Sequence, residues 1–162
     1  MTKLLKLGSF TVTDKIIVAD PCYHFDTLGT VTLHNVLSGK YIATAEVEKN
    51  LIAALHISHS DFKNDILESE SAGYIAVDSG QAGFFDLDFF RKNQGGEFGD
   101  LNSFYGLACA ITLSAKQAGV IKKRGVVSSS GFGDGCYDVF VSRDEVGKIV
   151  AASLFFLEEE DL

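Results

Sequence analysis

The feature that most constrains the fold is a series of short apolar segments, rich in β-branched or aromatic residues and bounded by Gly, Asp or Ser. Nine such segments cover residues 6–12, 15–20, 39–48, 51–58, 73–80, 81–89, 124–130, 136–142 and 147–157. Their length and composition are typical of β-strands. Their close spacing leaves no room for the crossover helices that parallel strands need. We therefore expect a mainly β or α+β fold of antiparallel meanders, forming a sandwich or an open barrel.

Two regions give more specific predictions. Within residues 100–118, Leu101, Tyr105 and Ile111 fall near one helical stripe, and Asp100 is a candidate N-cap, which predicts a helix over about 100–111. One or two short helices in total are expected. The C-terminal third predicts a three-stranded meander in which SGFGDG, residues 130–135, forms a hairpin tip.

Length and charge narrow the class of protein. The 162 residues suit one domain over 1–162, and the net charge of −8 argues against nucleic acid and anionic membranes as partners. The basic run 122–124 is interpreted as a solvated face. Cys22, Cys109 and Cys136 form neither a disulfide framework nor a paired C-x-x-C zinc motif. Without a visible signal peptide or an apolar run of about 18 residues, we expect a cytoplasmic protein with reduced thiols.

Three aspartates follow apolar segments: Asp20 in IVADPCY, Asp78 in IAVDSGQ and Asp134 in SGFGDGCY. If these ends meet, the carboxylates form a cluster of the kind that binds a divalent cation such as Mg²⁺ or Ca²⁺. Adjacent carboxylates can also raise one pKa and create a general acid or base. The alternative is that each aspartate hydrogen-bonds the amides of its own turn.

The glycine-rich segment 130–135 fits none of the common phosphate or calcium loops. No Gly-Lys-Ser/Thr follows it, the next residues predict a strand where a dinucleotide fingerprint needs a helix, and the alternating oxygen ligands of an EF-hand are missing. A loop that exposes its backbone remains. Its glycines could let a ligand approach the main chain, or could form a bulged hairpin.

Other polar residues extend these candidates. Gln81 could recognise a ligand amide or cap its turn, and Asp86 could share a strand face with Asp88 or cap a short helix. The sequence Asp-x-Cys-Tyr occurs twice, at 20–23 and 134–137, so Cys22 and Cys136 could form a thiol pair or a soft-metal site if the two loops are neighbours. His56 and His59 have a spacing that binds zinc on a helix, but they lie at a strand end and predict a surface pair.

Three blocks together, IVADPCY, VDSGQAGFFD and GVVSSSGFGDGCYDVFV, resemble a bacterial and phage family of unassigned activity, domain of unknown function 4241. The resemblance extends from Ile17 to about Phe156. It implies a small cytosolic protein and supplies no catalytic residues to carry over. It implies a signature made of Asp20, Cys22, Tyr23, Asp78, Gly80, Gln81, Asp86, Ser130, Gly131, Gly133, Asp134, Gly135 and Tyr137. A signature can encode fold or function.

The sequence as a whole predicts a binding or interaction domain with a polar rim that takes a small polar molecule, a metal ion or a protein partner. The predicted ligand-binding residues are Asp20, Cys22, Tyr23, Asp78, Ser79, Gln81, Asp86, Ser130, Gly131, Gly133, Asp134, Gly135 and Tyr137. One alternative is a metal-assisted hydrolase in which Asp20, Asp78 and Asp134 hold a divalent cation that polarises a water. Another is a purely structural or oligomeric module with a large apolar interface.

Overall fold

The computed structural model describes residues 2–24, 27–91 and 99–158. In these ranges the strands are β1 (Lys3–Val12), β2 (Ile16–Ala19), β3 (Val31–Leu33), β4 (Gly39–Glu48), β5 (Leu51–His59), β6 (Glu70–Val77), β7 (Gln81–Asp86), β8 (Ala118–Ile121), β9 (Gly125–Ser129), β10 (Gly135–Arg143) and β11 (Ile149–Phe155), and the helix is α1 (Phe104–Thr112). Each of the nine predicted segments contains a strand, so the mainly β prediction is confirmed.

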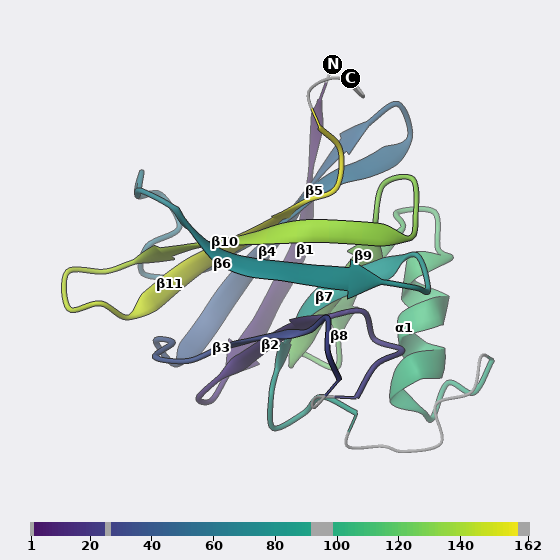
Figure 1. Cartoon of the computed structure of the whole chain (residues 1–162), viewed down its shortest axis with the longest axis horizontal. Helices are drawn as coiled ribbons and strands as arrows, with labels where there is room; N and C mark the ends of the chain where they lie inside the picture. Colours follow the sequence, from purple (N-terminus) through teal and green to yellow (C-terminus); the bar gives the residue numbers. More distant parts are fainter. Residues whose placement is uncertain (1, 25–26, 92–98, 159–162) are drawn as a thin grey trace.

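The strands form two antiparallel sheets, one of six strands in the order β1-β4-β5-β11-β10-β6 and one of five in the order β3-β2-β7-β9-β8 (Figure 1). The sheets stay separate and pack face to face, which is the sandwich alternative. One apolar core lies between them and draws on both, with Tyr41 and Leu55 from the large sheet and Phe84 and Val126 from the small one.

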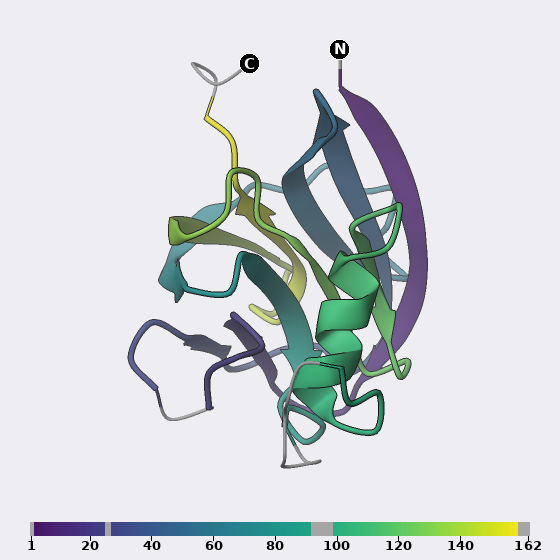
Figure 2. The ribbon, with the colours of Figure 1, turned by 90° about the vertical axis from the view of Figure 1, so that its right-hand side faces the viewer.

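The centre of the small sheet is buried on both faces. All four residues of β2 and all six of β7 are buried, because α1 and the turn after β7, which carries Phe90, cover the face that points away from the large sheet (Figure 2). A second apolar cluster fills this outer layer and joins Phe85 of β7 and Ile121 of β8 to Phe104 and Ala108 of α1. A strand buried on both faces is read in the sequence as a continuous apolar run, as in IIVA.

The predicted three-stranded meander at the C-terminus is wrong in one respect. β10 and β11 do form a hairpin, but β9 belongs to the small sheet and pairs with β7 and β8. Residues 130–134 therefore cross from one sheet to the other and are not a hairpin tip. β6 and β7, which follow each other at residues 77–81, likewise belong to different sheets. The β10–β11 hairpin is inserted between β5 and β6.

The predicted helix exists but begins later than expected. Its N-cap is Ser103, whose Oγ accepts a hydrogen bond from the Gly106 amide at 3.0 Å, while Asp100 caps a separate turn through the Asn102 amide. Sequence reasoning also missed β3 and β8, which are only three and four residues long. Within the described ranges no helix is long and apolar enough to cross a membrane.

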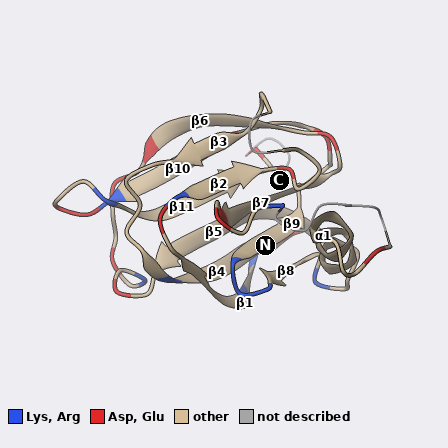
Figure 3. Cartoon of the chain, turned by 90° about the horizontal axis from the view of Figure 1, so that it is seen from below, with Lys and Arg blue, Asp and Glu red and all other residues tan. Residues whose placement is uncertain are grey.

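One edge of the large sheet is the ten-residue strand β1. Its pairing with β4 shifts register between Lys6 and Gly8, where Gly8 has a φ of +117°. A positive φ strains any residue with a Cβ, so a bulge of this shape favours glycine. Figure 3 shows that most acidic and basic residues fall in the loops and at strand ends.

Candidate functional site

Two crossovers between the sheets meet at one end of the sandwich. Residues 78–80 lead from β6 to β7, and residues 130–134 lead from β9 to β10. The Ser130 amide donates a hydrogen bond to the Gly80 carbonyl at 3.1 Å. A Cβ on Gly80 would lie 3.9 Å from the Cα of Gly133, so the two loops are in contact. The loops that carry Asp78 and Asp134 thus lie side by side.

Asp20 joins the loop that follows β2 to this pair. Its side chain is completely buried, and four donors surround it. Oδ2 accepts from the amides of Asp78 and Ser79 at 2.8 and 2.6 Å, while Oδ1 accepts from the Cys22 amide at 2.8 Å and the Ser79 hydroxyl at 2.6 Å. A buried carboxylate with its oxygens occupied in this way is a structural anchor. Asp20 accepts a hydrogen bond from an amide of its own turn, as one of the two alternatives predicted, and it also accepts hydrogen bonds from a second loop.

Cys22 and Tyr23 lie beside this anchor. Burial raises the pKa of the Cys22 thiol to about 12, and the nearby Asp20 carboxylate adds to the effect. The Tyr23 hydroxyl donates to Asp78 Oδ2 at 2.6 Å at the surface, and this hydrogen bond raises the Tyr23 pKa. A thiol that stays protonated is a poor nucleophile, so this environment does not activate Cys22.

Gln81 connects the same region to the helix. It is buried, its Nε2 lies 3.3 Å from Ser79 Oγ and 3.4 Å from Cys109 Sγ, and its Oε1 accepts from the Thr112 hydroxyl at 3.1 Å. Burial and a hydrogen bond with Cys109 raise the pKa of Tyr105 to about 12. Gln81 therefore holds the helix against the sheet.

Sequence reasoning missed the three residues of α1 that complete this polar layer, Tyr105, Cys109 and Thr112. A signal for them exists, because positions four and three apart lie on one face of a helix. The sequence FYGLACAIT alone does not show that this face meets Gln81.

The crossover at 130–134 is braced from inside. Ser130 Oγ donates to the Gly133 carbonyl at 2.8 Å, and the Tyr137 hydroxyl contacts the carbonyls of Ser130 and Gly133 at 3.1 and 2.6 Å. Gly131 has a φ of +60°, and a Cβ there would lie 2.9 Å from the Leu157 side chain, so the turn requires glycine at this position. The bracing leaves Phe132 outside, with 72% of its surface exposed.

Asp134 and Asp78 lie at the same end of the large sheet. The last pair of the β6–β10 ladder is Val77 with Gly135, and the two aspartates are the next residues beyond it. Both are exposed. We call the exposed residues Asp78, Phe132 and Asp134, together with the half-buried Tyr23, the rim.

Asp86 does not belong to this region. In the pairing of β2 with β7, Asp86 lies opposite Ile16 and Gly83 opposite Ala19, so Asp86 and Asp20 are at opposite ends of the small sheet. The Asp86 side chain is completely buried and accepts hydrogen bonds from Arg124 Nε, at 2.8 Å, from Arg124 Nη2 and from the Thr13 hydroxyl. Its place in the ligand-binding set stays a prediction, and in the structure the carboxylate is used in an internal ion pair.

The proposed metal cluster finds no support in the geometry. Among the described residues, no group of three or more His, Cys, Asp or Glu side chains is arranged to hold a metal ion. Asp20 is turned inward to amides, whereas Asp78 and Asp134 are exposed. Cys22 and Cys136 are both free thiols. His56 and His59 point to opposite faces of β5, since His59 is buried beside Tyr41 and His56 lies on the outer face.

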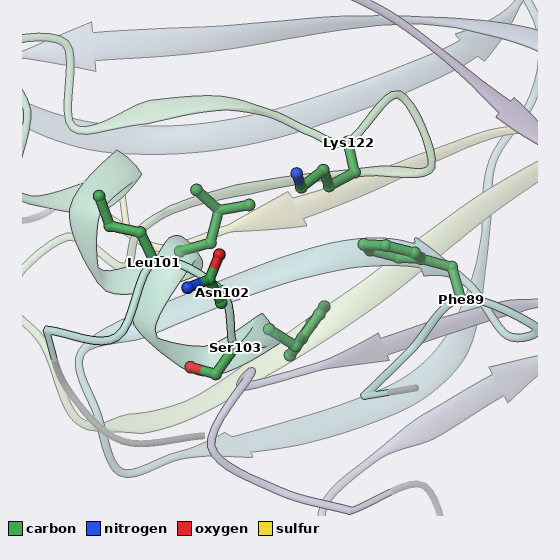
Figure 4. A pocket seen from close by; sticks show the side chains of 7 residues that line it. Phe89, Leu101, Asn102, Ser103 and Lys122 are labelled. Atoms are coloured by element: carbon green, nitrogen blue, oxygen red, sulfur yellow. The ribbon is translucent and has the colours of Figure 1, made fainter. Parts of the chain in front are cut away.

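A separate pocket of about 280 Å³ lies beside the start of α1 (Figure 4). Leu101, Asn102 and Ser103 line one side, and Phe89 and Lys122 face them across the opening. Phe104 and Leu107 complete a lining that is mainly apolar. A pocket of this size with one cation at its mouth suits a small molecule that has an apolar body and an anionic group.

Comparison of the chain with protein-family models, with curated proteins and with solved structures gave no match. The resemblance of the three blocks to a family of unassigned activity therefore stays a prediction.

Proposed function

We propose that the protein is a binding module whose rim recognises a basic, apolar-containing segment of a protein partner. The observation that carries this proposal is Phe132, a large aromatic side chain held in solvent on a turn that is braced by Ser130 and Tyr137. An exposed aromatic residue on a rigid loop is a typical interface anchor, because little conformational entropy is lost when it is buried.

The charge of the rim indicates the chemistry of the partner. Asp78 and Asp134 flank the end of the β6–β10 ladder, and the chain as a whole carries a net charge of −8. Leu28, which is 95% exposed, adjoins Gly29, whose carbonyl accepts a hydrogen bond from Ala76 near the same end of β6. Two carboxylates at the end of a sheet that also exposes apolar side chains suit a peptide that combines Lys or Arg with apolar residues.

The anchoring residues serve this function indirectly. Asp20 and Gln81 are used up in internal hydrogen bonds, so they fix the shape of the loops and do not contact the partner. The cavities described for this chain lie elsewhere, which favours a protein partner over a small molecule at the rim.

Selection from a random peptide library on the immobilised protein tests the proposal. We expect enrichment of sequences with two or more Lys or Arg beside an aromatic or aliphatic residue, with affinity that falls as salt rises. Phe132→Ala should weaken a selected peptide at least about tenfold. Val146→Ala is the matched control, because Val146 is 81% exposed on the hairpin at the other end of β10. Equal loss in both variants, or enrichment of acidic peptides, would contradict the proposal.

A second candidate function rests on the pocket beside α1. Its apolar lining and Lys122 favour a small aromatic or aliphatic carboxylate. We expect such acids to raise the melting temperature by selective binding to the folded state, and the corresponding amides to raise it less. A response that is unchanged in Lys122→Gln would rule out an anionic ligand in this pocket.

A further inference from the structure

The outer face of the large sheet carries a hydrogen-bonded chain of three side chains from three adjacent strands. His56 of β5 lies directly opposite Ser153 of β11, and Glu46 of β4 lies opposite Ala54, two residues from His56. The Ser153 hydroxyl is 2.6 Å from His56 Nδ1, and Glu46 Oε2 is 2.5 Å from His56 Nε2. These three hydrogen-bonded side chains lie outside the rim and outside the pocket.

The acceptor at one end fixes the direction of the hydrogen bonds. An ionised carboxylate can only accept, so the proton that it shares with the ring sits on Nε2. In the neutral ring Nδ1 then carries a lone pair, and it faces the Ser153 hydroxyl. A hydroxyl, an imidazole acceptor and a carboxylate that orients the imidazole are arranged in the order that nucleophilic catalysis needs.

We propose that these three side chains form an acyl-transfer site in which Ser153 is the nucleophile, His56 the general base and Glu46 a positioning residue. Ser153 Oγ attacks the acyl carbon while His56 Nδ1 takes its proton, and the bond from the acyl carbon to the leaving oxygen or sulfur breaks. The leaving group departs with that proton, so an acyl ester of Ser153 forms. Water then attacks the ester with His56 as base, which releases a carboxylic acid and restores the serine.

The surroundings define the reacting part of the substrate. The His56 side chain is 26% exposed, so the site is open to solvent on one side. Phe155 packs edge-on against His56 with ring centroids 5.5 Å apart, and Phe140 packs against Phe155 at 5.8 Å, which forms an apolar wall. Ser153 lies within continuous ladders with β10 and β5, so the backbone amides beside it are used in strand pairing. The acyl carbon must therefore be activated by its own leaving group, as in aryl esters and thioesters.

A basic groove on the same face indicates what the far end of the substrate carries. It has a volume of about 670 Å³ and is lined by Lys6, Lys40 and Lys63 together with Thr44 and other residues of β1, β4 and β5. In the part of the chain that the structure describes, none of these lysines forms an ion pair. Lys6, Thr44, His56 and Ser153 are successive partners across four strands, which places Lys6 about 14 Å from Ser153. The substrate class is therefore an elongated, activated acyl compound with an anionic group at its far end.

Labelling of the intact protein with an alkyl phosphonyl fluoride tests the nucleophile. We expect one phosphonyl group per chain, located on Ser153 by peptide mass mapping, with fluoride as the leaving group. His56→Ala should slow labelling about 100-fold, because general base catalysis is lost. Ser71→Ala is the matched control, since Ser71 is an exposed serine on β6 of the same sheet. Circular dichroism confirms that each variant is folded. Undiminished labelling in Ser153→Ala would overturn the proposal.

Hydrolysis of two p-nitrophenyl esters, one with a terminal carboxylate and one with a neutral end, tests the substrate class and Glu46. We expect Glu46→Gln to lower kcat for both esters with KM unchanged, because the carboxylate orients the base. A rise in KM with kcat unchanged would show that Glu46 binds substrate and would overturn its positioning role.

The double variant Lys6→Gln, Lys40→Gln tests the anionic end of the substrate. It should raise KM for the anionic ester several-fold and leave KM for the neutral ester unchanged. Equal effects on both esters would overturn the anionic substrate class.

Discussion

Asp20 and Asp86 are both completely buried carboxylates, and they lie at opposite ends of the same small sheet, but different groups stabilise them. Asp20 accepts from three backbone amides and one hydroxyl that belong to two loops. Asp86 is paired with the guanidinium of Arg124, which is 35% exposed. A buried aspartate can thus fix either the shape of loops or the packing of strands, depending on whether its hydrogen-bond donors are backbone amides or a side chain.

The difference in donors determines how the rim is held in place. Because the donors to Asp20 are main-chain amides, the positions of residues 22, 78 and 79 depend on a single carboxylate. Arg124 provides a side-chain donor that a different pair of residues could replace. Asp20 is therefore the residue through which the loops at one end of the sandwich acquire a fixed geometry.

The largest expected effect comes from Asp20→Asn. An asparagine keeps the shape but directs N–H donors at amides that are themselves donors. We expect a loss of about 4 kcal/mol in the free energy of unfolding, measured by urea denaturation. Asp14→Asn is the control, because the Asp14 side chain is 75% exposed. A loss below about 1 kcal/mol would mean that the amides find other acceptors, and the contrast with Asp86 would fail.

Asp86→Asn should cost less, about 2 kcal/mol, because solvent reaches part of the unpaired Arg124. The double variant Asp86→Leu with Arg124→Met tests whether apolar side chains can replace the ion pair. Since a side-chain pair can be replaced by apolar groups of similar volume, the double variant should be more stable than Asp86→Asn. No second substitution is expected to rescue Asp20→Asn in this way. A double variant as unstable as the single one would show that the pair is also needed for strand register.

The Cys22 thiol reports on the Asp20 anchor. Burial, reinforced by Asp20, raises its pKa from the usual 9.0 to about 12, so iodoacetamide at pH 8 should alkylate Cys22 at least about tenfold more slowly than the exposed Cys136. The unfolded chain loses this proton first as pH rises. Its contribution to stability is therefore complete below about pH 9 and declines between about 9 and 12. Equal alkylation rates for the two thiols would contradict this environment.

Tyr23→Phe should have the smallest effect. The hydrogen bond to Asp78 lies at the surface, where solvent competes, so we expect a loss of about 0.5 kcal/mol. Spectrophotometric titration gives an independent readout, because the bond to Asp78 raises the Tyr23 pKa. Asp78→Asn should therefore lower the pH at which Tyr23 ionises. A titration curve that does not change would show that the hydroxyl is not held by Asp78 in solution.

The sequence predicts the strands well because each one repeats a local signal, a short apolar run between turn formers. It does not predict sheet membership. Residues 78–80 and 130–134 have hairpin composition but connect the two sheets, since pairing depends on partners far away in the chain. The positions of Asp20, Asp78 and Asp134 at strand ends favour a shared rim, but only the assembled sheets bring the three loops together.

The roles of individual residues were harder to predict. Whether Asp86 faces a ligand or Arg124, 38 residues later, is a property of the assembled sheet. The same holds for Gln81, whose partners on α1 follow only from the packing of the helix. Phe132 was overlooked because an aromatic residue in an apolar-rich chain suggests the core, and only the braced turn keeps it outside.

The bulge at Gly8 has a consequence for behaviour at high concentration. An edge strand can offer amides and carbonyls on which another chain adds as a strand, and such addition is the first step of aggregation. In β1 the Thr11 amide is already used, because it donates to the Lys123 carbonyl at 2.9 Å. The shift of register at Lys6 and Gly8 interrupts this edge, and the lysines next to it repel an identical edge. The bulge thus works against strand addition at this edge, and a chain in which β1 ran straight would be expected to associate more readily through it.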